Sequence, residues 1–150
     1  MPLLTRCAIR MALLYLLLGF VIGGLLISAK AGVVDVRAWL WLPSHVDLLL
    51  VGWMIQMAIG MAYWILPRLR ISAQADHLTR GRSVLAWLAF VLLNVGLGLA
   101  AGLGILRYWL PDLLWLSNTF PLGIVLQVLA LIIFATYAWS RVIPMPILKR

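Results

Sequence analysis

Four long apolar stretches constrain the fold more than any other feature of this 150-residue sequence. They cover approximately residues 11–29, 46–67, 83–106 and 114–139. A bilayer core about 30 Å thick requires about 20 consecutive apolar residues in helical form, and each stretch is long enough. Only 11% of the residues are charged, against about 25% in an average soluble domain. The sequence therefore predicts an all-α membrane protein, a single four-transmembrane-helix bundle over residues 1–150.

The basic residues lie in short segments between the apolar stretches, and their distribution predicts an orientation. Four spans place both termini on one side, and cytoplasmic loops carry an excess of Lys and Arg. We therefore expect both termini in the cytoplasm of a bacterial-type inner membrane. The side of the termini carries nine basic residues, and the other side carries three, which are Lys30, Arg37 and Arg107. Because no single element collects the +8 net charge, nucleic-acid binding is not expected.

Residues for hydrolytic or thiol chemistry are scarce. Cys7 is the one cysteine, which excludes an intrachain disulfide and a site of several thiolates. The carboxylates Asp35, Asp47, Asp76 and Asp112 fall at span ends or in loops and are expected to be unpaired. No catalytic Ser-His-Asp arrangement, phosphate-binding glycine loop or zinc-protease motif is present. General acid–base catalysis and carboxylate metal sites are therefore poorly supported.

The second apolar stretch carries the candidate site. At 100° per residue, Gly52, Gln56 and Tyr63 fall within about 20° of His45. This face combines a ligand-type nitrogen with a glycine, an amide and a phenol. A flat macrocycle needs an axial nitrogen and neighbours without side chains. The pattern predicts a haem near the outer membrane face, with His45 as ligand and Gly52, Gln56 and Tyr63 beside it.

The same stretch resembles the second transmembrane helix of subunit I of the haem-copper oxidase superfamily. The shared pattern is H-x6-G-W-x6-G-x2-Y-x3-P-R, carried by His45, Gly52, Trp53, Gly60, Tyr63, Pro67 and Arg68. It is similar to nitric oxide reductase and oxygen reductase large subunits and to NnrS-like haem proteins. The resemblance implies that His45 is an axial ligand of low-spin haem b. It covers this helix only, and the family's second low-spin ligand and copper-binding His cluster have no counterpart.

The remaining charged candidates are interpreted from their position in the chain. His77 comes after Asp76 in an Arg-rich loop and is expected to be solvated, about 30 Å from His45. Arg37 and Arg107 are expected on the outer side, where haem propionates need cationic partners. Plain anchoring at the membrane interface is the alternative role for both arginines.

The number of axial haem ligands that one chain offers predicts an oligomer. Six-coordinate haem needs two axial groups, and Met54, Met57 and Met61 point about 120–180° away from His45 at 100° per residue. A second copy related by a twofold axis would supply the other histidine, which predicts a homodimer or a subunit of a larger membrane complex. GxxxG pairs that permit close helix contact occur at Gly19/Gly23 and Gly98/Gly102.

These observations favour a membrane b-type haem protein that transfers electrons, alone or as a subunit of a respiratory oxidoreductase, with no catalytic role assigned to this chain. Two alternatives stay open. One is an oxidase-derived structural or assembly subunit without cofactor, and the other is a haem-based sensor of NO or redox state. A Soret band in the visible spectrum would separate both haem proteins from the structural subunit.

Overall fold

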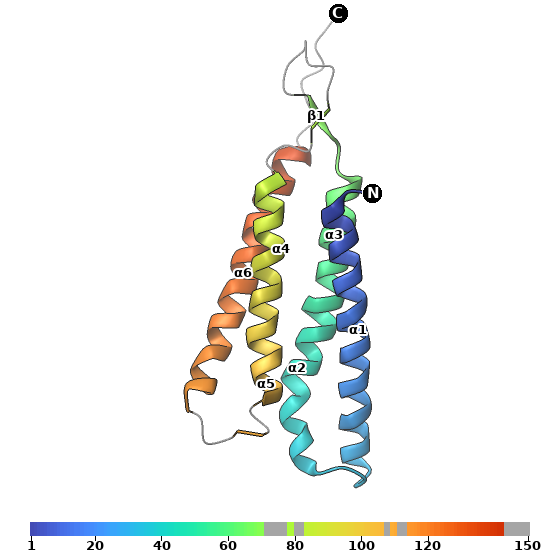
Figure 1. Ribbon diagram of the computed structural model, residues 1–150, viewed down its shortest axis with the longest axis vertical. Coiled ribbons are helices and arrows are strands. Elements are labelled where there is room, and N and C mark those ends of the chain that lie inside the picture. The colour runs from blue at the N-terminus through green and yellow to red at the C-terminus, as the bar shows by residue number, and fades with distance from the viewer. Residues whose placement is uncertain (71–77, 80–82, 107–108, 111–113, 143–150) are drawn as a thin grey trace, which may run out of the picture.

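The computed structural model describes residues 1–70, 78–79, 83–106, 109–110 and 114–142. Four long helical segments lie side by side, each antiparallel to the one before it in the chain (Figure 1). The first is α1 (Leu3–Lys30), and the fourth is α6 (Leu114–Val142). The second consists of the 3-10 turn η1 (Val36–Trp41), α2 (Leu42–Asp47), the π-helical segment η2 (Leu48–Ile55) and α3 (Gln56–Ile65). The third consists of α4 (Ser83–Leu97), the π-helical segment η3 (Gly98–Gly102) and α5 (Leu103–Leu106).

All four segments are long and apolar enough to cross a membrane, which confirms the predicted four-helix architecture. The qualifying ranges within the described residues are Leu3–Lys30, Val36–Ile65, Ser83–Leu106 and Pro121–Val142. Two of them begin earlier than predicted. The helix α1 includes Arg6 and Arg10, and the residues just before the second predicted stretch form η1, which runs directly into α2.

A glycine follows the C-terminus of α1, and a proline follows the C-terminus of α3. Gly32 has a φ of 77°, the left-handed conformation common after a helix C-terminus, and its N–H donates to the carbonyl of Ala29 at 3.1 Å. The helix α3 ends because Leu66 precedes Pro67. Leu66 has a ψ of 139°, since the proline ring disfavours helical backbone in the residue before it.

A minimal hairpin comes after α3. The strands β1 (Leu69–Arg70) and β2 (Leu78–Thr79) pair antiparallel, with Leu69 opposite Thr79. The hairpin extends beyond the end of the bundle where α3 ends (Figure 1). Each strand has two residues, and the other elements of the described residues are helical, so the fold class is unchanged.

The helices pack closely because glycines let backbones approach. The helix α1 lies along η2 and α3, and α4 lies along α6 (Figure 1). A Cβ atom built on Gly96 would lie 2.6 Å from the carbonyl oxygen of Gly123. A Cβ on Gly123 would in turn lie 2.7 Å from the carbonyl oxygen of Gly96. The crossing of α4 and α6 therefore requires small residues at both positions.

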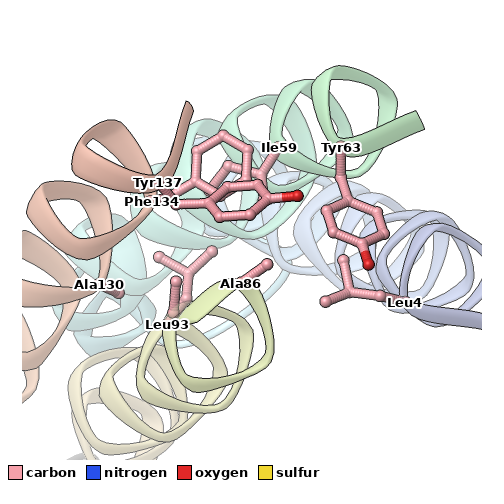
Figure 2. Close-up of a cluster of buried hydrophobic side chains, with 9 residues drawn as sticks. Leu4, Ile59, Tyr63, Ala86, Leu93, Ala130, Phe134 and Tyr137 are labelled. Carbon is pink, nitrogen blue, oxygen red and sulfur yellow. The ribbon is translucent and has the colours of Figure 1, made fainter. Parts of the chain in front are cut away.

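One buried cluster joins all four segments near the end of the bundle where α1 begins. Figure 2 shows its members, which are Leu4, Ile59, Tyr63, Ala86, Ala89, Leu93, Ala130, Phe134 and Tyr137. The rings of Tyr63 and Tyr137 stack with centroids 5.8 Å apart and an interplanar angle of 27°. This contact holds α3 against α6.

Arg141 closes the same end of the bundle and is only 2% exposed. Its Nε donates to the carbonyl oxygen of Pro67 at 2.9 Å, and its guanidinium also donates to the carbonyls of Leu66 and Tyr63. The hydroxyl of Tyr137 accepts a further hydrogen bond at 2.6 Å. The last carbonyls of a helix have no partner within it and carry partial negative charge. Arg141 therefore caps α3 from α6.

Candidate functional site

His45 lies in α2 with its ring against α1. Its Nδ1 is 2.8 Å from the carbonyl oxygen of Gly19. A carbonyl only accepts hydrogen bonds, so Nδ1 carries the hydrogen and Nε2 keeps the lone pair. Among the described residues, Nε2 has no hydrogen-bond partner. This is the tautomer of a typical metal-ligating histidine, in which one ring nitrogen donates to a carbonyl and the other is open to bind.

The GxxxG pair of α1 is what makes room for this ring. A Cβ on Gly23 would lie 2.7 Å from Cε1 of His45, and a Cβ on Gly19 would lie 2.8 Å from Cγ of Leu49. The pair therefore packs against the second segment of its own chain, and that surface is covered. The other predicted pair differs, because a Cβ on Gly98 or Gly102 would meet nothing within 4 Å in the described structure.

A groove of about 340 Å³ opens beside His45 on the outer surface of the second segment. Its lining is apolar apart from the imidazole and consists of His45, Val46, Leu49, Leu50, Trp53 and Met54. The expectation that Met54 points away from His45 does not hold, since both side chains line this groove. The reason is the π-helical segment η2 between them. Its i→i+5 hydrogen bonds widen the turn, so each residue rotates by less than the 100° of an α-helix.

The predicted haem-lining residues beyond His45 face protein. A Cβ on Gly52 would lie 2.8 Å from Cδ2 of Leu97 and 2.9 Å from Cβ of Tyr15. The carboxamide of Gln56 is fully buried, and its Nε2 donates to the carbonyl of Ala8 at 3.4 Å.

The third of these residues, Tyr63, is 4% exposed and packs in the buried cluster of Figure 2. Gly52, Gln56 and Tyr63 thus share the interior of the bundle, where α1, α4 and α6 fill the space beside them.

Of the other charged candidates, the structure describes only Arg37. The side chain of Arg37 is exposed, and its backbone N–H donates to Oδ1 of Asp35 at 2.8 Å. Arg107, His77 and Asp76 lie outside the described residues. In the described part of the chain, Arg37 makes no hydrogen bond to His45.

Sequence reasoning missed three polar contacts inside the bundle. The distribution of charge predicts only that Arg141 is one of the nine basic residues on the side of the termini. It does not predict that Arg141 caps α3. The hydroxyl of Tyr15 donates to Oδ1 of Asn94 at 2.8 Å. Nε2 of Gln127 donates to Oδ2 of Asp47 at 2.9 Å, a partner that the sequence analysis did not predict. The available signal was that Gln127 and Asn94 interrupt apolar stretches, where polar side chains usually find partners.

The described part of the chain contains no group of three or more His, Cys, Asp or Glu side chains placed to hold a metal ion. Comparison of the whole chain with protein-family models, curated proteins and solved structures finds no significant match.

Proposed function

We propose that this chain is a membrane b-type haem protein that transfers electrons, alone or as a subunit of a respiratory complex. The observation that carries the proposal is the hydrogen bond from His45 Nδ1 to the carbonyl of Gly19, which leaves the lone pair on Nε2 of a side chain that lines an apolar groove. A haem ligand of this kind needs a fixed ring and an available nitrogen. When bound, haem would supply one-electron redox chemistry, and His45 would hold the iron and tune its potential.

The residues fit a haem on the outer side of α2 and η2 and do not fit one on the inner face. The interior neighbours of Gly52 leave no space for a macrocycle, because Tyr15 and Leu97 occupy it. The groove lined by Leu49, Leu50 and Trp53 offers an apolar surface next to the imidazole. Gln56 and Tyr63 would then support the helix that carries His45 and would not touch the cofactor.

The experiment is the visible spectrum of the purified protein, reduced and oxidised. We expect a Soret band in the wild type and in His77→Ala, and its loss in His45→Ala. His77→Ala is the matched control, because it removes the other histidine of the chain. A protein without a Soret band after expression with excess haem would contradict the proposal.

The orientation of the chain is part of the proposal. The nine-to-three distribution of Lys and Arg supports cytoplasmic termini in a bacterial-type inner membrane, and with that orientation His45 is near the outer face. A C-terminal reporter that is active only in the cytoplasm should give a signal. Activity of a periplasm-specific reporter at the same position would reverse the assignment.

Arg37 and Arg107 would hold the haem propionates at that outer face. Both arginines are on the side that carries only three basic residues, and anionic groups at a membrane surface need charge-assisted hydrogen bonds. Arg37→Ala and Arg107→Ala should lower haem content or shift the midpoint potential. Unchanged values in both variants would leave these arginines as interfacial anchors.

A second candidate function is that of a structural or assembly subunit without cofactor. One observation favours it. The interior face that carries Gly52 is covered by Tyr15 and Leu97 of the same chain, as in a helix bundle without a cofactor. The haem-based sensor of NO or redox state shares the site with the leading proposal and differs in the response to ligand binding. The absence of a Soret band would favour the structural subunit.

A further inference from the structure

Asp47 is an ionisable side chain inside a membrane-spanning segment, and the proposed haem site does not use it. It lies within the apolar range Val36–Ile65. Among the described residues its one side-chain partner is Gln127, which donates to Oδ2 from α6 at 2.9 Å. An amide supplies a hydrogen bond and no charge. A carboxylate in this setting is costly without a compensating cation, and such residues commonly mark ion sites.

A second polar group near Asp47 also lacks a partner. Ser44 is fully buried, and its hydroxyl makes no hydrogen bond to any described residue. Ser44 and Asp47 are three residues apart in α2, a spacing that puts their Cβ atoms about 5–6 Å apart on one face. A buried hydroxyl without a partner loses about 1–3 kcal/mol of solvation. Its position next to a carboxylate therefore points to a ligand that both oxygens contact.

The third segment packs closely on these polar groups through glycines. A Cβ built on Gly104 of α5 would overlap Oγ of Ser44. The side chain of Gln127 packs in a similar way on Gly96, where a Cβ would lie 3.0 Å from its Cγ. Glycines thus stand where the third segment packs on Ser44 and on Gln127, so at these two positions no side chain of that segment covers the polar groups.

We propose that Ser44, Asp47 and Gln127 bind one small monovalent metal cation of the Na⁺ class between α2, α5 and α6. Carboxylate, hydroxyl and carboxamide oxygens are the ligands that hard cations prefer. A single carboxylate balances one positive charge, whereas divalent sites usually collect several. Within the described residues no group of three His, Cys, Asp or Glu side chains exists to hold a divalent ion. The site is independent of haem binding.

The test is the thermal unfolding of the full chain in detergent at one pH, with NaCl replaced stepwise by choline chloride at constant ionic strength. A ligand that binds only the folded state raises the Tm with its concentration. We expect NaCl to raise the Tm of the wild type by about 3–5 °C and to have no effect on Asp47→Asn. The matched control is Asp35→Asn, which removes an exposed carboxylate outside the span and should respond like the wild type.

Ser44→Ala separates a site from a general salt effect. It keeps the carboxylate and removes one ligand, so the half-saturating NaCl concentration should rise about tenfold. The same variant decides the question if Asp47→Asn does not fold. A Tm that rises equally in choline chloride would overturn the proposal, and so would an unchanged half-saturating concentration in Ser44→Ala. A Tm that does not respond to NaCl would also overturn it, and would mean that another group neutralises Asp47.

Discussion

A Cβ atom on Gly23 would lie 2.7 Å from Cε1 of His45, so the imidazole packs directly on the backbone of α1. A Cβ atom on the neighbouring Gly24 would meet nothing within 4 Å among the described residues. Two adjacent glycines of the same helix therefore differ in their contact with the histidine ring. This difference supplies a matched pair of variants.

We predict that Gly23→Ala displaces the ring of His45 and breaks its hydrogen bond to Gly19. Overpacking of this kind costs about 1–3 kcal/mol, so the free energy of unfolding should fall by that amount. Haem content per chain should fall with it. Gly24→Ala should leave haem content unchanged and stability unchanged or slightly higher, because its methyl group enters open space and alanine favours helix over glycine. Equal behaviour of the two variants in denaturation and absorbance measurements would contradict the packing of His45 on Gly23.

Arg141 offers a test of how the bundle is closed. Arg141→Met removes the donors to the carbonyls of Leu66 and Pro67 and leaves these acceptors without the cap. Hydrogen bonds to charged groups contribute about 1.5–3 kcal/mol, and we expect a loss of stability of about this size. The control is Arg10→Met, which replaces an exposed arginine of α1. Chemical denaturation in detergent measures both, and equal stabilities would show that the cap contributes nothing.

The crossing of α4 and α6 gives a third prediction. Gly96→Ala pushes a methyl group against the backbone of Gly123, which cannot move as a flexible side chain would, and should destabilise the fold by about 1–3 kcal/mol. Gly98→Ala, two residues later, meets nothing within 4 Å among the described residues. It should be neutral or slightly stabilising, since alanine favours helix over glycine. A neutral Gly96→Ala in thermal unfolding would argue against this crossing.

The sequence predicts the helices well and the faces of the second segment less well. Apolar length predicts the four long helical segments, because a bilayer core requires about 20 apolar residues of a helix that crosses it. The face on which each residue after His45 lies is predicted with an α-helical rotation of 100° per residue. The π-helical segment η2 changes that rotation. Met54 is therefore predicted opposite His45, although both line one groove. The partner of Asp47 could not be predicted, since Gln127 is 80 residues away and only packing brings them together.

The groove beside His45 also bears on how many chains one haem requires. The structure offers one imidazole per chain within the described residues, and its tautomer leaves the lone pair on Nε2. Met54 lines the same groove, but it belongs to the same helix nine residues later, whereas axial ligands must approach opposite faces of the ring. A twofold axis along the membrane normal would place the groove of a second copy, and its His45, on the other face.

We therefore predict a haem-to-chain ratio near one half in a homodimer, with the spectrum of bis-histidine ligation. His45→Ala should lose the haem, while Met54→Leu should keep both the ratio and the spectrum, because it removes the sulfur and retains apolar bulk. The measurements are pyridine haemochrome quantification, low-temperature electron paramagnetic resonance and light scattering in detergent. A ratio of one with a five-coordinate high-spin spectrum in a monodisperse monomer would contradict the dimer. A six-coordinate spectrum replaced by a high-spin one in Met54→Leu would instead assign the second axial position to the methionine.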